Sequence, residues 1–331
     1  MSITIKDVAK EAGVSVATVS RVLNGSCNVS DESTKKVNET IARLNYSPNF
    51  LGRNLRKCET NVILVIMPTS EHSLYSKIVM GMQEYAGKVG YDIITAVSYS
   101  TSTAETRQMN MLFNRTVDGV ILLGTQYDAD SLNKLAENYN VALCCEGVEG
   151  ANVLTVAVDD EQAAFDAVAA LIKKGHKRIG FIGTNSAAIS STARENGYIR
   201  ALKEYGIEIK NEYIYKESYD YDCGGRAFEY FNALDEKPTA IFAVSDLLAI
   251  SAMHKAIDMD IDVGKDVAIM GFDNISMCEW IIPTLSTVEQ PCSKMGELVV
   301  AKLIENMNKT TKDNHYYTVD HRIILRESTG D

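Results

Sequence analysis

The sequence has 331 residues, of which 46% are hydrophobic, and this length favours two or three domains over one compact core. No apolar stretch approaches the roughly 20 residues of a bilayer-spanning helix, and residues 1–14 lack the apolar segment of a signal peptide, so we expect a cytoplasmic protein. Seven cysteines without a C-x-x-C pair argue against both a disulfide framework and a zinc site.

The net charge of −11 is unevenly distributed along the chain. Residues 1–60 carry a charge of +3, and the remaining residues carry −14. A basic N-terminal segment attached to an acidic body is typical of a protein whose N-terminal segment alone contacts nucleic-acid phosphates.

Three short helices are predicted in the N-terminal segment. The first, over residues 5–12, begins with the capping-box pattern Thr4-x-x-Asp7 and ends at Gly13. Ser15 can cap the second helix and Ser30 the third. The apolar side chains at helical spacing predict a small shared core from Val8, Ala9, Ala12, Val19, Val22, Leu23, Val37, Ile41 and Leu44.

The first two helices, separated by a tight glycine turn, form a helix-turn-helix pattern. Any small helical bundle can produce this pattern. The second helix directs Val16, Ala17 and Arg21 away from the predicted core, where they either contact DNA or merely cover the bundle.

Residues 48–57 form the next element. Pro48 restricts the residue before it, and Leu51 and Leu55 lie four positions apart among basic residues. A segment this short and polar is marginal as an isolated helix.

From residue 61 onward, apolar runs alternate with amphipathic stretches, which predicts doubly wound parallel sheets. The rhythm begins again after residue 158 and indicates two similar lobes. Strands are predicted at 62–67, 91–97, 119–123, 141–145, 153–158, 178–182, 240–244 and 267–272, and helices at 78–88, 104–114, 132–138, 163–174, 195–205 and 247–253. In such sheets, ligands bind at the carboxyl ends of the strands, and two facing lobes place one site between them.

Four segments of the N-terminal region closely resemble the headpiece of the lactose repressor family. They are residues 5–9 (IKDVA), 12–15 (AGVS), 17–24 (ATVSRVLN) and 44–49 (LNYSPN). The resemblance implies that the second helix enters the DNA major groove, with Val16 and Ala17 at base edges and Arg21 at a guanine or phosphate. It also implies further DNA contacts from Thr4, Ser15, Thr18, Ser20, Asn24, Ser30, Tyr46 and Asn49.

The same resemblance makes residues 48–60 a hinge helix and linker that order on DNA. Leu55 would then insert into the minor groove and kink the operator. Gly52 stands where the family commonly has alanine, and this should raise the cost of ordering the helix by up to about 1 kcal/mol.

The family resemblance continues through the body. It is carried by residues 158–160 (VDD), 175–179 (GHKRI), 194–198 (RENGY), 270–274 (MGFDN), 283–288 (PTLSTV) and 326–329 (REST). It implies a fold like that of periplasmic binding proteins and a small-molecule effector held by Tyr75, Glu146, Ser190, Arg194, Tyr219, Ser245 and Asp273. Acids from both lobes with one arginine between them suit a polyhydroxylated ligand such as a sugar or sugar derivative. Alternatively, Arg194 and Asp273 could form a structural ion pair across the cleft.

The domains expected are 1–47 (helix-turn-helix), 48–60 (hinge and linker) and 61–331 (effector binding and dimerisation). Lobe 1 would comprise about 61–157 and 290–319, and lobe 2 about 158–289 and 320–331. No heptad extension follows the last strand, so we expect a homodimer that binds a pseudo-palindromic double-stranded operator as a transcriptional repressor. No metal, cofactor or membrane partner is expected.

The sequence lacks G-x-S-x-G, a P-loop and metal-ligand spacing among its five histidines, which argues against an enzyme. Adjacent Cys144 and Cys145 could sense redox state, but a buried strand end favours inert thiols. A solute-binding protein shares the bilobal body but would have an export signal and no DNA-binding head. A regulator controlled by a protein co-regulator, as in the catabolite-control relatives whose pair at positions 16 and 17 is similar, also stays open.

Overall fold

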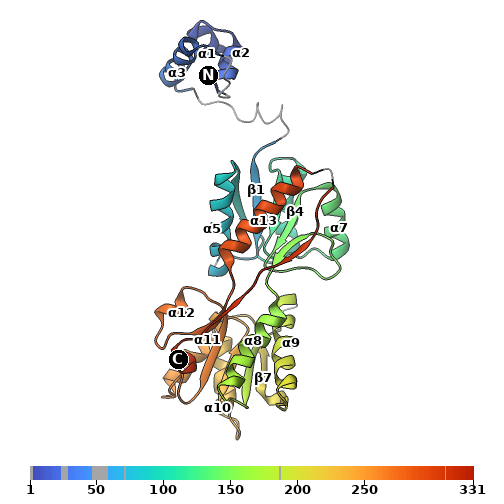
Figure 1. Ribbon diagram of the computed structural model, residues 1–331, viewed down its shortest axis with the longest axis vertical. Coiled ribbons are helices and arrows are strands. Elements are labelled where there is room, and N and C mark those ends of the chain that lie inside the picture. The colour runs from blue at the N-terminus through green and yellow to red at the C-terminus, as the bar shows by residue number, and fades with distance from the viewer. Residues whose placement is uncertain (1–2, 24–28, 47–58, 71, 186–187, 310) are drawn as a thin grey trace. The chain divides into compact units, whose positions relative to one another are not determined.

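The computed structural model describes residues 3–23, 29–46, 59–70, 72–185, 188–309 and 311–331. It divides the chain into two compact units, residues 1–59 and 60–331. The fold class predicted from the sequence is confirmed, because a helical head is followed by two parallel-sheet lobes (Figure 1). None of the described helices is long and apolar enough to span a membrane.

The head, residues 3–23 and 29–46 of the first unit, contains three helices. They are α1 (Ile5–Ala12), α2 (Val16–Leu23) and α3 (Asp31–Leu44). Val8, Ala9, Val19 and Val37 are buried where the helices meet. Gly13 follows α1 with a φ of 66°, a left-handed conformation that glycine adopts without steric cost. The helix boundaries and inner faces predicted for the head are therefore confirmed.

Lobe 1 is built on a six-stranded sheet, sheet A, with the order β11-β5-β4-β3-β1-β2. Helices α5 and α13 cover one face of this sheet, and α6 and α7 cover the other. Its elements are β1 (Val62–Met67), α5 (Ser73–Lys88), β2 (Asp92–Val97), α6 (Ser102–Phe113), β3 (Gly119–Leu122), α7 (Ala129–Asn138), β4 (Val141–Cys144), β5 (Leu154–Ala157), α13 (Cys292–Met307) and β11 (Tyr316–Thr318).

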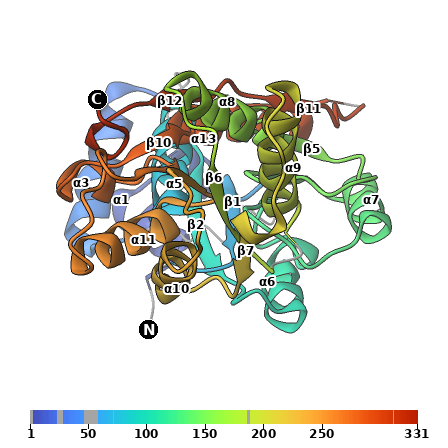
Figure 2. The ribbon, with the colours of Figure 1, turned by 90° about the horizontal axis from the view of Figure 1, so that it is seen from below.

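Lobe 2 repeats this plan with sheet B, whose order is β12-β10-β9-β8-β6-β7. Helices α8 and α9 lie side by side on one face of sheet B, and α10 and α11 lie on the other (Figure 2). Its elements are α8 (Asp160–Lys173), β6 (Ile179–Thr184), α9 (Ile189–Glu204), β7 (Ile214–Glu217), α10 (Tyr221–Asn232), β8 (Ala240–Ala243), α11 (Asp246–Asp258), β9 (Ala268–Asp273), α12 (Met277–Trp280), β10 (Ser286–Glu289) and β12 (Arg322–Ile324), with short 3₁₀ turns at Asn211–Tyr213 and Glu327–Thr329.

Three segments connect the lobes: β5 to α8, β10 to α13, and β11 to β12. All three leave from the β5/β11 edge of sheet A or the β10/β12 edge of sheet B. The strands β2 and β7 therefore lie at the opposite edges of the two sheets, farthest from the connections.

Glycine allows α5 and α13 to pack closely. A Cβ atom on Gly296 would lie 2.2 Å from the carbonyl oxygen of Ile78, and one on Gly81 would lie 2.3 Å from that of Ser293. A Cβ atom essentially never makes contacts this short, so a side chain at either position would force the two helices to shift apart.

Candidate DNA-contacting surface and interlobe site

Helix α2 presents the predicted base-reading side chains to solvent. Val16 is 42% exposed, and Ala17 and Arg21 are also exposed. Val19, on the opposite side of the helix, is completely buried and fixes α2 against the rest of the head. The surface of α2 is thus available for a partner, and its contact with DNA stays a prediction.

Three of the predicted phosphate-contacting residues precede the three helices of the head. The Thr4 hydroxyl donates to Asp7 Oδ2 (2.7 Å) at the start of α1. Ser15 Oγ accepts the Thr18 backbone N–H (3.1 Å) at the start of α2, and Ser30 Oγ accepts a backbone N–H (3.4 Å) in the first turn of α3. Helix N-termini present free N–H groups and a partial positive charge, which attract phosphate oxygens.

The other predicted DNA contacts have different environments. Thr18 and Ser20 are half-buried on α2, and Tyr46 packs against the core of the head. Asn24, Asn49 and Leu55 lie outside the described residues.

In the body, the predicted effector residues lie at or just after the carboxyl ends of parallel strands. They come from both lobes. Together with His72 and Asp160, which lie among them, we call these residues the interlobe site. Its members are His72 and Tyr75 after β1, Glu146 after β4, Asp160 after β5, Ser190 and Arg194 after β6, Tyr219 after β7, Ser245 after β8 and Asp273 at the end of β9. This is where open α/β sheets bind their ligands.

Direct hydrogen bonds join the two lobes at this site. Glu146 Oε1 of lobe 1 accepts from the backbone N–H (3.2 Å) and the hydroxyl (3.3 Å) of Ser190 in lobe 2. His72 Nε2 of lobe 1 lies 2.9 Å from the Tyr219 hydroxyl and 3.7 Å from Asp273 Oδ2, both in lobe 2. Groups from the two lobes are therefore close enough to hold the same small molecule.

Arg194 lies at the centre of the lobe 2 side. Its Nε donates to Asp160 Oδ1 (2.8 Å), its Nη1 donates to the Val244 carbonyl (2.6 Å), and its guanidinium stacks 3.6 Å from the centre of the Phe272 ring. Nη1 is 3.6 Å from Asp273 Oδ1. The alternative of an Arg194–Asp273 ion pair is therefore present, with Asp160 as the closer partner. It is wrong that this pair crosses the cleft, because both residues belong to lobe 2.

Burial and charge shift the pKa values of this site. Burial raises the pKa of Asp160, although the neighbouring Arg194 opposes this effect. Burial would lower the pKa of Arg194, but Asp160 and Asp273 outweigh it and the value is raised. Burial, followed by the charge of Asp273, raises the pKa of Tyr219 to about 12, so its phenol is protonated and can donate a hydrogen bond at neutral pH.

The two remaining predicted residues have distinct roles. Tyr75 is half-buried against the lobe 1 core, and burial raises the pKa of its phenol. Ser245 is buried and caps α11, since its hydroxyl accepts the Leu248 backbone N–H (3.4 Å). A hydrogen bond with Ser245 partly opposes the rise in the pKa of Tyr219.

Left-handed backbone occurs at several strand ends of the body, two of which, those of β4 and β9, carry interlobe residues. Positive φ angles occur at Tyr99 (51°), Ser100 (52°), Cys145 (75°), Asp273 (120°) and Asn274 (51°), all directly after or at the end of β2, β4 and β9. Non-glycine residues rarely adopt such conformations, and they concentrate where a binding site requires them.

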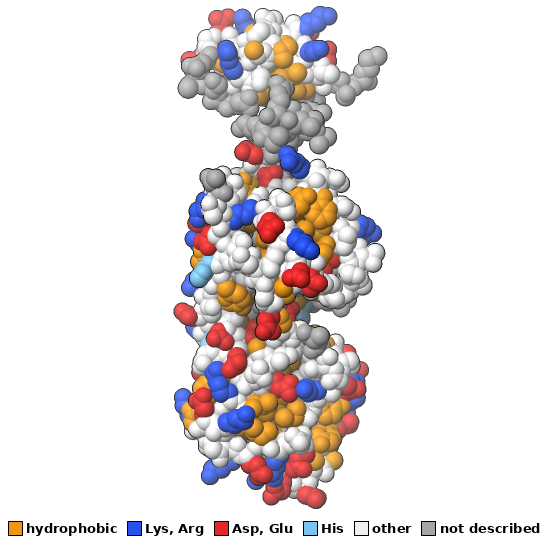
Figure 3. Space-filling model, turned by 90° about the vertical axis from the view of Figure 1, so that its right-hand side faces the viewer, with side chains coloured by type: hydrophobic (Ala, Val, Ile, Leu, Met, Phe, Trp, Pro, Cys, Tyr) orange, Lys and Arg blue, Asp and Glu red, His pale blue; other side chains and the backbone are white. Residues whose placement is uncertain are grey.

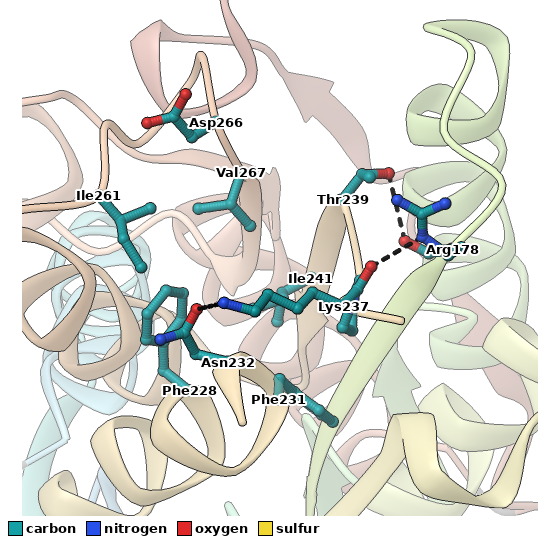
Figure 4. Close-up of a pocket in the computed structure, with 11 residues that line it drawn as sticks. Arg178, Phe228, Phe231, Asn232, Lys237, Thr239, Ile241, Ile261, Asp266 and Val267 are labelled. Atoms are coloured by element: carbon teal, nitrogen blue, oxygen red, sulfur yellow. Dashed lines mark hydrogen bonds between the residues drawn. The ribbon is translucent and has the colours of Figure 1, made fainter. Parts of the chain in front are cut away.

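A cavity of about 340 Å³ lies elsewhere in lobe 2, at the amino ends of its strands (Figure 4). Buried Phe231 and Ile241 line its apolar wall, and the Arg178 Nε donates to the Lys237 carbonyl (2.8 Å) beside it. None of the predicted effector residues lines this cavity.

Three residues of the interlobe region were not predicted from the sequence. Asp160 belongs to the family-like motif at 158–160, which was the available signal, but its partner Arg194 is not readable from spacing. His72 precedes Tyr75 by one helical turn. The third is Lys77, whose Nζ donates to the Asn274 carbonyl (2.7 Å) and joins α5 to lobe 2.

The cysteines behave as small apolar residues in the part of the chain that the structure describes. Cys144, Cys223, Cys278 and Cys292 are buried and free, and Cys145 is half-buried and free. Interaction with Cys144 and burial raise the pKa of Cys145, which disfavours its reactive thiolate.

Comparison with known proteins matches both parts of the chain. Residues 4–49 match the family model "Bacterial regulatory proteins, lacI family", and residues 168–329 match the periplasmic binding protein-like domain. Catabolite control protein A of Priestia megaterium is 38% identical over 331 residues, covering 99% of this chain and 100% of that protein.

Solved structures agree in fold over nearly the whole length. A lac repressor dimer bound to operator and the anti-inducer ONPF superposes with a TM-score of 0.89 at 23% identity, covering 99% of each chain. The CelR–cellobiose complex has a TM-score of 0.74 at 27% identity, covering 98% of this chain and 99% of that one. The chain is a DNA-binding transcription regulator rather than an enzyme, and it belongs to the lacI family of bacterial regulatory proteins.

Proposed function

We propose that this regulator acts in the cytoplasm as a homodimeric repressor whose affinity for a pseudo-palindromic operator is controlled by a sugar or sugar derivative bound at the interlobe site. The observation that carries the proposal is the pair of interlobe contacts, Glu146–Ser190 and His72–Tyr219, between residues that also carry hydroxyl-binding groups. A ligand that replaces these contacts would bind residues of both lobes at the same time.

The charges of the site favour a neutral polyol over a phosphate or carboxylate ligand. Three carboxylates, those of Glu146, Asp160 and Asp273, stand against the single guanidinium of Arg194 in the interlobe site. Carboxylates accept hydrogen bonds from sugar hydroxyls and repel anions. The Tyr75 and Tyr219 rings add apolar faces on which a sugar ring can rest.

Control of DNA binding follows from linkage between two states of the body. An effector shifts the arrangement of the lobes only by its difference in affinity for the two arrangements, typically 1–3 kcal/mol of coupling. The hinge at 48–60, whose Leu55 would wedge into the minor groove, would transmit the change to the head, where Val16, Ala17 and Arg21 would read base edges. The similarity to a cellobiose-bound regulator supports a sugar as the effector.

A thermal-shift screen of the purified full-length protein against hexoses, disaccharides, sugar phosphates and nucleobases tests the proposal. A ligand at 100 times its dissociation constant stabilises the protein by about 2.7 kcal/mol, which is easily visible. The variant Glu146→Gln should bind the sugar more weakly, whereas Glu149→Gln, on an exposed side chain of the same loop, should bind it normally. Stabilisation by anionic ligands alone would contradict the proposal.

The second candidate is a regulator controlled by a docked protein co-regulator. The 38% identity to a catabolite control protein supports it. If no small molecule stabilises the protein, and a cell extract instead supplies a protein that raises or lowers operator affinity, the second candidate replaces the first.

A further inference from the structure

The two lobes carry an equivalent Ser-Tyr pair on equivalent strands. In lobe 1, Ser98-Tyr99 follows β2, and in lobe 2, Ser218-Tyr219 follows β7. Each tyrosine lies two residues beyond its strand, and a helix begins shortly after it: α6 three residues after Tyr99 and α10 two residues after Tyr219. The repeat of the fold thus places one tyrosine on each lobe at matching positions.

Both strands are edge strands, on the side of the sheets away from the connections between the lobes. All strands of sheet A that carry Tyr99 or the interlobe residues are parallel, so their carboxyl ends share one side of the sheet. Tyr99 therefore lies on the side of sheet A that carries His72 and Glu146. It lies at the outer edge, whereas Asp160 lies beside the connections.

Contacts of Tyr219 indicate that this outer edge belongs to the interlobe site. The Tyr219 hydroxyl bonds His72, which follows β1, and β1 is the strand that pairs with β2. The Tyr219 and His72 rings are stacked, with their centres 6.2 Å apart. Tyr219 of lobe 2 therefore contacts the end of β1, and β1 is the neighbour of β2, the strand that precedes Tyr99.

The side chain of Tyr99 is largely uncovered by the residues that the structure describes. It is 74% exposed, compared with 45% for Tyr219, and it is held on two successive left-handed residues, Tyr99 and Ser100. Glu146 and Asp160, by contrast, follow β4 and β5, which lie nearer the connections. From β4, which precedes Glu146, to β2 is three strand spacings, or roughly 14 Å, which is longer than one sugar ring.

We propose that Tyr99 is an outer aromatic platform of the interlobe site and that the effector is an oligosaccharide of two or more rings. The inner ring takes the polar groups around Arg194 and Glu146, and an outer ring stacks between Tyr99 and Tyr219. This inference rests on the proposed function, because it specifies the sugar that the same site accepts.

Isothermal titration of the full-length protein with gluco-, galacto- and manno-configured hexoses and their disaccharides tests the inference. A disaccharide should bind more tightly than its hexoses. Tyr99→Ala should weaken disaccharide binding roughly three- to tenfold, the size of one ring contact, and leave hexose binding unchanged. Tyr99→Phe should retain the wild-type affinity, because it keeps the ring.

Tyr205→Ala is the matched control, since Tyr205 is 42% exposed but caps the opposite end of α9. Melting temperatures should be equal for all these variants, because neither ring is buried. Equal disaccharide affinity in the wild type and Tyr99→Ala, or hexose binding as tight as disaccharide binding, overturns the inference while the proposed function survives. Absence of binding to every sugar overturns the proposed function, and this inference with it.

Discussion

Removing the guanidinium of Arg194 should destabilise the body as well as its ligand site. In Arg194→Ala, the carboxylates of Asp160 and Asp273, 10% and 3% exposed, lose the cation between them. Breaking a buried ion pair by removing one partner costs about 3–5 kcal/mol, because a charge is left without compensation. The free energy of unfolding of the full-length protein should fall by this amount at neutral pH.

The loss should depend on pH in a defined direction. Burial already places the folded-state pKa of Asp160 above its ordinary value, and removal of Arg194 raises it further. A carboxyl with a raised folded-state pKa favours folding when it is protonated, and this contribution disappears as the pH rises through the folded-state value. The deficit of Arg194→Ala should therefore be smaller at pH 5 than at pH 8.

Urea unfolding at both pH values measures the deficit. The control is Arg200→Ala on the same helix, whose Nη1 donates to Glu161 (2.6 Å), because that pair is 34% and 38% exposed. Partly exposed ion pairs contribute about 1 kcal/mol or less. Equal losses for the two variants, or a loss for Arg194→Ala that is the same at both pH values, would refute the assignment of Arg194 to a buried ionic cluster.

Three further predictions concern packing, titration and capping. Gly296→Ala should cost about 1–3 kcal/mol because its Cβ meets the Ile78 carbonyl, whereas Gly87→Ala, with no atom within 4 Å, should be neutral or stabilising in thermal unfolding. Burial raises the pKa of Asp246 from 3.8 to about 7, so its contribution to stability is present below pH 3.8 and lost as the pH rises through 7; Asp246→Asn should abolish this slope in pH-dependent unfolding. Ser15→Ala should destabilise the head by about 1 kcal/mol and weaken DNA binding equally across sequences, and a loss confined to one operator would contradict a phosphate contact.

Local features of the head could be predicted from the sequence because their causes are local. Ser15 and Ser30 cap the helices that they were expected to cap, and Gly13 ends α1. No helix was predicted at α10, where Gly224 lowers the helix propensity. Glycine stands at this position because of tertiary packing, since a Cβ on Gly224 would lie 2.0 Å from the Leu248 carbonyl oxygen of α11.

The partners within the site were harder to predict, because they depend on distant packing. Arg194 meets Asp160 only because α8 and α9 lie side by side, and His72 meets Tyr219 only because the lobes face one another across 147 positions of sequence. The burial of the strand predicted at 91–97 was equally hard to predict, because it depends on the place of that strand in the sheet. β2 is only half-buried, because it lies at the edge of sheet A rather than inside it.

The surface of the body is consistent with its acidic charge. Acidic and basic side chains are interspersed over the face of residues 60–331 drawn in Figure 3. A body with net charge −14 is repelled by DNA, so nonspecific attraction to DNA should come from the basic segment 1–60.

The three connections between the lobes also determine when the body can fold during synthesis. Sheet A is completed by β11, and sheet B by β12, two strands from the last sixteen residues of the chain. Helix α13, which covers one face of sheet A, is also made late. Neither lobe can therefore reach its final state before β11 and β12 have been made, whereas the head has no such dependence and can fold as soon as it emerges. A nascent chain stalled before residue 292 would carry a finished head on two open sheets, each exposing apolar surface to chaperones.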